Sequence, residues 1–231
     1  MSAAILRRQL DEMRRLYPGH KDIVVIGHSM GGMISRLLLT DSKMTIWNAF
    51  FDKAPGAIPF TAEARRIMSQ SLIFDPQPGI SRVLFLSASH RGSDMATDFF
   101  GRLGAKLIGN PVSQKEINKE VYAYVRPDVR ASGRHRLPNS IDLLDPENHF
   151  LKTVNALPLK AGVPFHSLIG DRGRGGSFDH TKPASSDGIV PYWSSHMGGA
   201  LSERIIPSGH WSHLHPLGMV EIKRILNDNL N

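Results

Sequence analysis

The stretch GHSMG, residues 27–31, places a serine between two glycines where one apolar segment ends and another begins. Residues 22–26 favour a short buried strand and residues 31–40 favour a helix, so Ser29 is predicted to occupy a tight strand-to-helix turn. Such a turn strains the backbone and projects the serine hydroxyl away from the sheet. We expect both flanking glycines to be required, because neighbouring chain passes close on either side. Ser29 is therefore a candidate nucleophile.

The helix that follows Ser29 adds a second chemical feature to the turn. Its N-terminus carries a partial positive charge and points at the serine, and the backbone N–H of Met30 can donate to a developing oxyanion. His28 adjoins Ser29 in the sequence, but its side chain is expected to leave the turn in another direction. We interpret His28 as a packing or supporting residue and not as the base.

A serine hydroxyl becomes a good nucleophile only when a histidine takes its proton and a carboxylate orients that histidine. Ligand sites lie at the carboxyl ends of parallel strands, so the partners should follow late strands. His210 comes directly after a fourth predicted strand, and His213 is the alternative base. Asp171, Asp179 and Asp187 follow the third predicted strand, and we favour Asp187 over Asp171.

The spacing H-x-x-H-x-H of His210, His213 and His215 also raises the question of a metal site. Three histidines in one loop can bind zinc, but no paired acidic residue or helical i, i+4 arrangement supports that interpretation. The chain has no cysteine, which excludes disulfides and cysteine-ligated metals. We therefore expect no metal and no cofactor.

The elements that must position these residues alternate between strands and helices. Strands are predicted at residues 22–26, 81–89, 163–170 and 202–209. Apolar residues at helical spacing (Leu6, Leu10, Met13 and Tyr17) precede the first strand, and Pro216 opens a final helix whose predicted apolar side holds Met219, Val220, Ile222, Ile225 and Leu226. This order predicts an α/β fold with a mostly parallel sheet and helices on both faces, in one domain spanning residues 1–231.

Two long insertions interrupt this pattern. Residues 44–78 contain Trp47, Phe50 and Phe51, which with Trp193 either line an apolar pocket mouth or belong to the core. Residues 97–159 are rich in proline and glycine, and segments of this length are often caps or lids over a site. Ordinary peripheral helices are the alternative for residues 97–159.

The net charge of +7 is compatible with solubility or with attraction to anionic partners. The densest basic segment contains Arg126, Arg130, Arg134 and Arg136 without interleaved aromatic residues, so we interpret it as a solvated loop. No nucleic-acid partner is expected, whereas peripheral contact with a lipid surface is compatible with the charge. No signal peptide and no apolar run of membrane-spanning length is visible. The sequence does not indicate an oligomeric state.

Four motifs in the same order resemble those of α/β-hydrolases of the serine lipase and esterase kind. VVIGHSMGGMISRLLL resembles the lipase nucleophile elbow, and SASHRGSDMA, within residues 82–100, is similar to the PHxGSxxA segment of bacterial lipases and of GPI inositol-deacylase-like esterases. SSDGIVPYWSSH and SGHWSHLHP resemble the segments that carry the acid and the histidine. Ser89 stands where the bacterial lipase pattern has proline.

This resemblance implies hydrolysis of a small-molecule ester or lipid through an acyl-enzyme, without a cofactor. Ser29 would be the nucleophile, His210 the base, Asp187 the acid, and Met30 an oxyanion donor. His90 and Arg91 would be structural hydrogen bonders near the pocket floor. An acyltransferase or thioesterase with the same triad, or an inactive hydrolase-fold remnant, remains an alternative.

In the family fold several strands precede the nucleophile strand, but here residues 22–26 form the only strand predicted before Ser29. We therefore expect the N-terminal strands of the fold to be missing, together with the loop that supplies the second oxyanion donor. We interpret the chain as a fragment of a longer enzyme; a partner that supplies the rest is the alternative. The nucleophile strand would then lie at a sheet edge. The 231-residue chain alone is accordingly predicted to be poorly soluble and weakly active.

Overall fold

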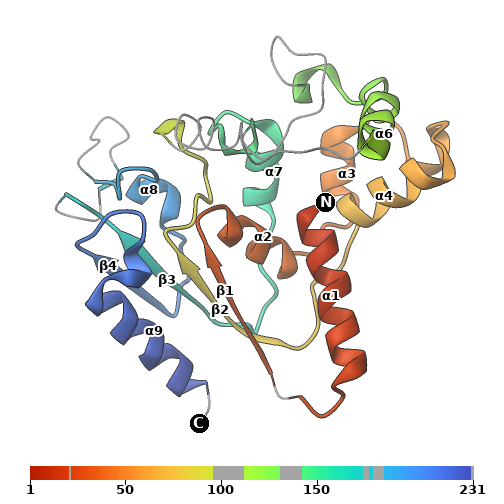
Figure 1. The fold of residues 1–231 in the computed structure, drawn as a ribbon. Coiled ribbons are helices and arrows are strands. Elements are labelled where there is room, and N and C mark those ends of the chain that lie inside the picture. The colour runs from red at the N-terminus through yellow and green to blue at the C-terminus, as the bar shows by residue number, and fades with distance from the viewer. Residues whose placement is uncertain (21, 96–111, 131–141, 174–176, 179–184, 230–231) are drawn as a thin grey trace.

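The structure, a computed structural model, describes residues 1–20, 22–95, 112–130, 142–173, 177–178 and 185–229. Within them lies one four-stranded sheet whose strand order is β1-β2-β3-β4 and whose neighbouring strands all pair in parallel (Figure 1). The strands are β1 (Ile23–His28), β2 (Ile80–Leu86), β3 (Phe165–Gly170) and β4 (Ser202–Ile206). The predicted parallel α/β architecture is confirmed, with β1 at one edge of the described sheet.

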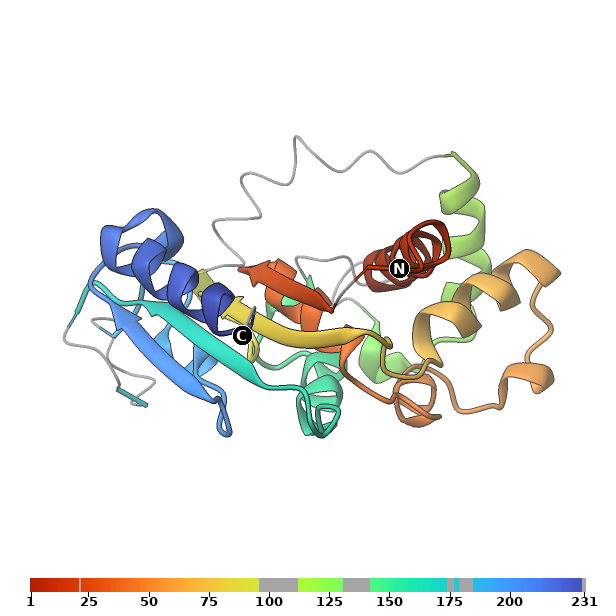
Figure 2. The same ribbon diagram turned by 90° about the horizontal axis from the view of Figure 1, so that it is seen from below.

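The apolar side chains of β2 alternate between two core layers. Val83 and Phe85 pack in a cluster with residues of α1 (Ser2–Leu16) and α2 (Met30–Leu38), whereas Leu84 and Leu86 pack toward α9 (Pro216–Asp228). This alternation follows from the two-residue period of a strand. Figure 2, viewed from below, shows α9 along one side of the sheet, whereas the residues of α1 and α2 that pack with Val83 and Phe85 cover the other; α7 (His149–Ala156) belongs to the insertions beside the sheet. The expected coverage of both faces is thus observed.

Helix α9 begins at Pro216 as predicted, and Ile222 and Ile225 of its predicted apolar side pack in the core, but the first turn of that side does not. Met219 and Val220 are exposed, while Gly218, Glu221 and Ile225 are buried. Gly218 sets this orientation, since a Cβ there would lie 2.0 Å from the backbone oxygen of Ser212. Glu221 tolerates burial because the Arg224 guanidinium donates to its carboxylate at 2.6 Å. Close backbone contact, not hydrophobicity alone, therefore decides which side of α9 packs against the rest of the protein.

The two insertions form a separate apolar cluster beside the sheet. The first holds α3 (Thr45–Phe50), a 3-10 turn (Pro55–Ala57) and α4 (Ala62–Leu72); the second holds α6 (Val112–Tyr122), 3-10 turns at Pro127–Val129 and Asp142–Leu144, and α7. Trp47 and Phe51 are fully buried there, as core residues, while Phe50 is partly buried and packs against them. Of the predicted cap at 97–159, residues 97–111 and 131–141 lie outside the described residues.

Two of the four arginines of the basic segment are described, and both have partners. Arg126 forms ion pairs with Asp52 and Asp128 at 3.2 Å each, and the Arg130 guanidinium lies 4.8 Å from the centre of the Tyr122 ring. Arg134 and Arg136 lie outside the described residues. In the described part of the chain, no helix is long and apolar enough to cross a bilayer.

The turn between β1 and α2 depends on two glycines, Gly27 and Gly32, of which only Gly27 belongs to the pair that flanks the serine. A Cβ on Gly27 would lie 2.7 Å from the Gly31 backbone oxygen, and one on Gly32 would lie 2.3 Å from the Ala88 Cβ. A Cβ on Gly31 would meet nothing within 4 Å. The expectation that both flanking glycines are required is therefore wrong for Gly31, because the close approach to β2 occurs one residue later.

We predict that Gly27→Ala and Gly32→Ala each lower the free energy of unfolding by about 1–3 kcal/mol, the usual cost of overpacking. Gly31→Ala should leave it unchanged or raise it by up to about 1 kcal/mol, because alanine is the better helix former. Urea unfolding followed by circular dichroism measures all three. Equal destabilisation by the three substitutions would contradict the packing described above.

Two buried histidines make the free energy of unfolding depend on pH. His90 lies in the loop after β2, edge-on to Phe85, and burial together with the charges of Arg36 and Arg91 lowers its pKa to about 3. Burial and the charges of Arg82 and Arg224 lower the pKa of His166 to about 4. In the unfolded chain both would bind a proton below about pH 6.5. Acid therefore favours the unfolded state.

The sign of this effect gives a second prediction. Between about pH 6 and 4.5 the unfolded chain binds the His90 proton and the folded chain does not, so stability falls as pH falls, by about 1.4 kcal/mol per pH unit for one histidine. His90→Leu should remove that part of the slope. Urea unfolding of both proteins across this pH range provides the measurement, and parallel pH curves would refute the assignment.

Candidate functional site

Ser29 lies at the junction of β1 and α2 with a strained backbone. Its φ is 55° and its ψ is −126°, a conformation that residues other than glycine rarely adopt. The turn is fixed on both sides, because the Ser29 N–H donates to the Leu86 oxygen of β2 and the Gly32 N–H donates to the Ser29 oxygen, each at 2.9 Å. The hydroxyl is buried and makes no hydrogen bond to another described residue. Strain of this kind is concentrated at functional sites.

Asp187 and His210 meet in a buried hydrogen bond, although they lie on different loops. The His210 Nδ1 lies 2.7 Å from Asp187 Oδ2, and the two residues are 1% and 0% exposed. The other carboxylate oxygen accepts the N–H groups of Ile189 at 2.8 Å and Val190 at 2.7 Å. A carboxylate only accepts, so Nδ1 of His210 carries the proton and Nε2 of the neutral ring carries the lone pair. This is the tautomer that a general base requires.

The loop that carries His210 is tied to the ends of the neighbouring strands. The Ser212 hydroxyl, in a 3-10 turn (Ser212–Leu214), lies 3.1 Å from the Ser87 hydroxyl, and the Ser87 oxygen accepts the Gly170 N–H at 3.2 Å. Ser87 follows β2 and itself has a φ of 45°, while Gly170 ends β3. The hydroxyl pair thus fixes the histidine loop across the carboxyl ends of β2 and β3.

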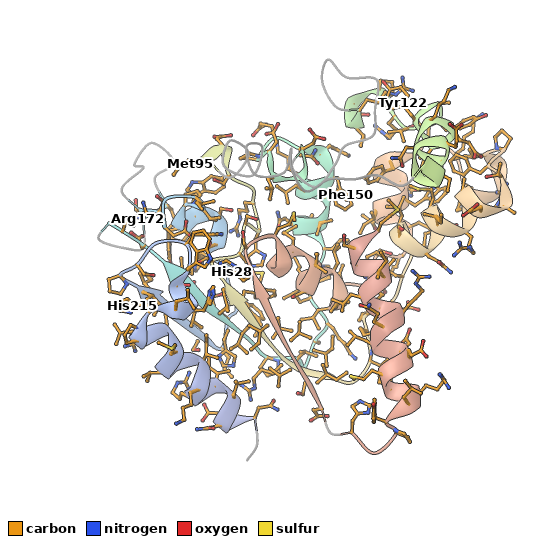
Figure 3. All side chains as sticks on the ribbon, viewed as in Figure 1. His28, Met95, Tyr122, Phe150, Arg172 and His215 are labelled. Atoms are coloured by element: carbon orange, nitrogen blue, oxygen red, sulfur yellow. The ribbon has the colours of Figure 1, made fainter. Side chains whose placement is uncertain are left out.

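Arg172 lies across the loops of the acid and the histidine. Figure 3 shows the labelled Arg172 and His28 near the same end of the sheet, whereas Tyr122 lies far away beside α6. A Cβ on Gly188 would lie 2.7 Å from the Arg172 guanidinium carbon, and one on Gly209 would lie 2.8 Å from its Nη2. Gly188 also has a φ of 92°. The absence of side chains at these two positions lets the guanidinium lie close to the backbone of Gly188 and Gly209, the residues next to Asp187 and His210.

The structure also places the alternative site residues. The Asp171 carboxylate accepts from the Gly173 N–H at 2.6 Å and from the Ser185 hydroxyl at 2.9 Å, so both of its oxygens bind within its own loop region. The ring of His213 packs 4.6 Å from His28, and burial and the charge of His210 lower its pKa. Asp179 lies outside the described residues. Only Asp187, among the described candidate acids, bonds to a candidate histidine.

His28 contacts His210 directly, a role that the sequence did not reveal. Its Nε2 lies 2.9 Å from the His210 backbone oxygen, and the two rings are 4.7 Å apart between centres. Burial lowers the pKa of His28, against the raising effect of the bond to the His210 carbonyl. No spacing in the sequence relates residues 28 and 210, so this contact, like those of Arg172, could be found only in three dimensions.

The remaining expected supporting residues differ in their contacts. The Arg91 guanidinium donates to the backbone oxygens of Trp193 and His196, so it is a structural hydrogen bonder as expected. Both ring nitrogens of His90 are buried without a hydrogen-bond partner among the described residues, which corrects the expectation for its side chain. Nor do the described residues contain a group of three or more metal-ligating side chains arranged to hold a metal ion.

Comparisons with known proteins agree with this architecture. No curated protein sequence matches the chain significantly. The propeptide form of the lipase BlEst2 from Bacillus licheniformis is similar over 95% of this chain and 39% of its own, with 14% identity and a TM-score of 0.50. The mature form of that lipase is similar over 97% of this chain and 72% of its own, with 15% identity and a TM-score of 0.48. The metagenomic carboxyl esterase MGS0156 is similar over 86% of this chain and 48% of its own, with 14% identity and a TM-score of 0.42.

The chain therefore spans less than half of the chain in two of these three solved structures, and at such identity the similarity concerns the fold alone. The family model described as "Alpha/beta hydrolase family" matches residues 2–222, nearly the whole chain. Together with the parallel sheet and its strand-to-helix serine turn, this match establishes that the chain belongs to the α/β-hydrolase family.

Proposed function

We propose that this chain is a serine carboxylester hydrolase that acts through a covalent acyl-enzyme. The observation that carries the proposal is the buried hydrogen bond between Asp187 and His210. Both residues lie at the end of the sheet where Ser29 occupies its strained turn. Nucleophile, base and orienting carboxylate are the three groups that acyl transfer by serine requires.

Each residue then has a defined part in the reaction. The Ser29 oxygen attacks the acyl carbon while Nε2 of His210 takes the hydroxyl proton, and Asp187 stabilises the imidazolium that forms. The imidazolium then gives its proton to the departing alcohol, which leaves the acyl group on Ser29. Water, deprotonated by His210, attacks the acyl-enzyme, and the carboxylic acid is released as Ser29 recovers its proton.

The oxyanion would be stabilised by the first turn of α2. The Met30 N–H lies at the first position of that helix, where backbone donors have no acceptor four residues earlier within the helix. This N–H points out of the N-terminal end of α2, where the helix dipole favours a negative charge. We assign Met30 as one oxyanion donor on this basis.

Residues 97–159 remain our candidate for a cap over the site. Leu144, from this insertion, is buried together with Ile189 and Val190, the two residues whose N–H groups bind Asp187. The Ser93 N–H also donates to the Leu144 oxygen at 2.8 Å. The insertion thus reaches the acid loop, which is where a cap would influence access of an ester or a lipid.

Ser29→Ala should abolish hydrolysis of p-nitrophenyl butyrate, with a fall in kcat of about 10⁴-fold or more, because it removes the attacking oxygen. Ser89→Ala is the matched control, since the Ser89 hydroxyl is also buried and has no hydrogen-bond partner among the described residues. Its kcat should stay within about twofold of the wild type. Undiminished hydrolysis in Ser29→Ala would exclude Ser29 as the nucleophile.

The two candidate acids can be separated by a pair of amide substitutions. Asp187→Asn should lower kcat by about 10⁴-fold with little change in KM, because the amide stabilises the wrong tautomer of His210. Asp171→Asn should cost less than about 10-fold, because its carboxylate binds only within its own loop region. Steady-state kinetics on folded proteins decides, and the reverse order of losses would make Asp171 the acid.

A further inference from the structure

The histidine next to the nucleophile also bonds to the loop of the base. His28 is the last residue of β1, and its Nε2 lies 2.9 Å from the backbone oxygen of His210. A carbonyl oxygen only accepts, so Nε2 carries the proton and donates it. The neutral His28 ring therefore has its lone pair on Nδ1.

Ring packing holds His28 from two sides. Its ring centre lies 4.7 Å from that of His210 and 4.6 Å from that of His213, with interplanar angles of 47° and 67°. Trp211 packs at 6.4 Å. The His28 ring thus contacts two histidines of one loop.

The position of His28 in the sheet makes this contact consequential. The strand register pairs His28 with Leu86, and the Ser29 N–H donates to the same Leu86 at 2.9 Å. The backbone of His28 is therefore as fixed as that of the serine beside it. The hydrogen bond from this side chain consequently connects the His210 loop directly to the Ser29 turn, in addition to the contact between Ser87 and Ser212.

We infer that His28 is a positioning residue, whose Nε2–H holds the His210 backbone at the end of the sheet where Ser29 lies. The inference rests on the proposed function, because it assigns His210 as the base. Asp187 orients the imidazole through its side chain, while His28 places the loop through its main chain. The two contacts act on different parts of the same residue.

The neutral state of the His28 ring fits this role. The charged or titratable groups that act on it are His210, His213 and Asp187. Burial lowers the pKa of His28, so its ring is neutral at pH 7. A neutral donor holds the His210 carbonyl without placing a second positive charge beside the imidazolium that catalysis creates.

The test compares two amides that differ by one methylene. In His28→Gln the side-chain amide nitrogen can reach the place of Nε2, whereas in His28→Asn it stops short. For the full chain with p-nitrophenyl butyrate, Gln should retain kcat within about threefold, and Asn should lower kcat by about 10- to 100-fold at similar KM, the scale of a misplacement of up to about 1 Å. Thermal unfolding of both variants checks that they fold alike.

A second readout does not depend on turnover. The proton on Nδ1 of His210, held by Asp187, should give a sharp downfield NMR signal in the wild type and in Gln, and a broadened one in Asn. Equal kcat in Gln and Asn, whether high or low, would overturn the inference. If the wild type shows no Ser29-dependent hydrolysis, the proposed function fails, and the NMR comparison alone decides whether His28 positions His210: identical signals in all three proteins would refute it.

Discussion

A carboxylate that no solvent reaches must find its hydrogen bonds within the protein, and this requirement organises the candidate site. Asp187 is fully buried, and its two oxygens accept from Ile189, Val190 and His210. An unpaired buried carboxylate would cost several kcal/mol, so the turn that offers two N–H groups and the loop that offers an imidazole must form together. Burial also keeps water from competing for the Asp187–His210 bond, which makes the orientation of the ring well defined.

The parallel sheet brings these loops together because all four strands end at the same edge. Ser29 follows β1, Ser87 follows β2, Asp187 belongs to the segment after β3, and His210 follows β4. The hydroxyl groups of Ser87 and Ser212 contact each other and connect the end of β2 to the loop that carries His210. Gly27, Gly32, Gly188 and Gly209 lie where backbone or a guanidinium approaches too closely for a Cβ. The strain at Ser29 is tolerated because β2 and α2 fix the turn from both sides.

Much of this arrangement could be predicted from the sequence, because local patterns determine it. The apolar runs located all four strands, and Gly27 to Gly31 located the strand-to-helix turn. Hydrophobicity located Ile222 and Ile225 on the buried side of α9. It could not predict that Met219 and Val220 are exposed, since the contact between Gly218 and the Ser212 oxygen turns the first turn of the helix. Gly31 looked necessary and Gly32 did not, because only the approach of Ala88 distinguishes them. Asp187 and Asp171 both follow β3 in polar segments, and they separate only through their long-range partners. Arg172 gave no signal, and the supporting role expected for His28 did not reveal His210 as its partner, because these contacts join residues remote in the chain.

In the proposed reaction, Ser29 is a nucleophile that His210 and Asp187 activate. The most direct test of this activation is mass spectrometry of the folded chain after treatment with a fluorophosphonate, which phosphonylates an activated serine and displaces fluoride. We expect one adduct, located on the peptide that contains Ser29, and its loss when His210 is replaced by alanine. A folded protein that takes up no phosphonyl group, or carries it on another serine, would contradict the account.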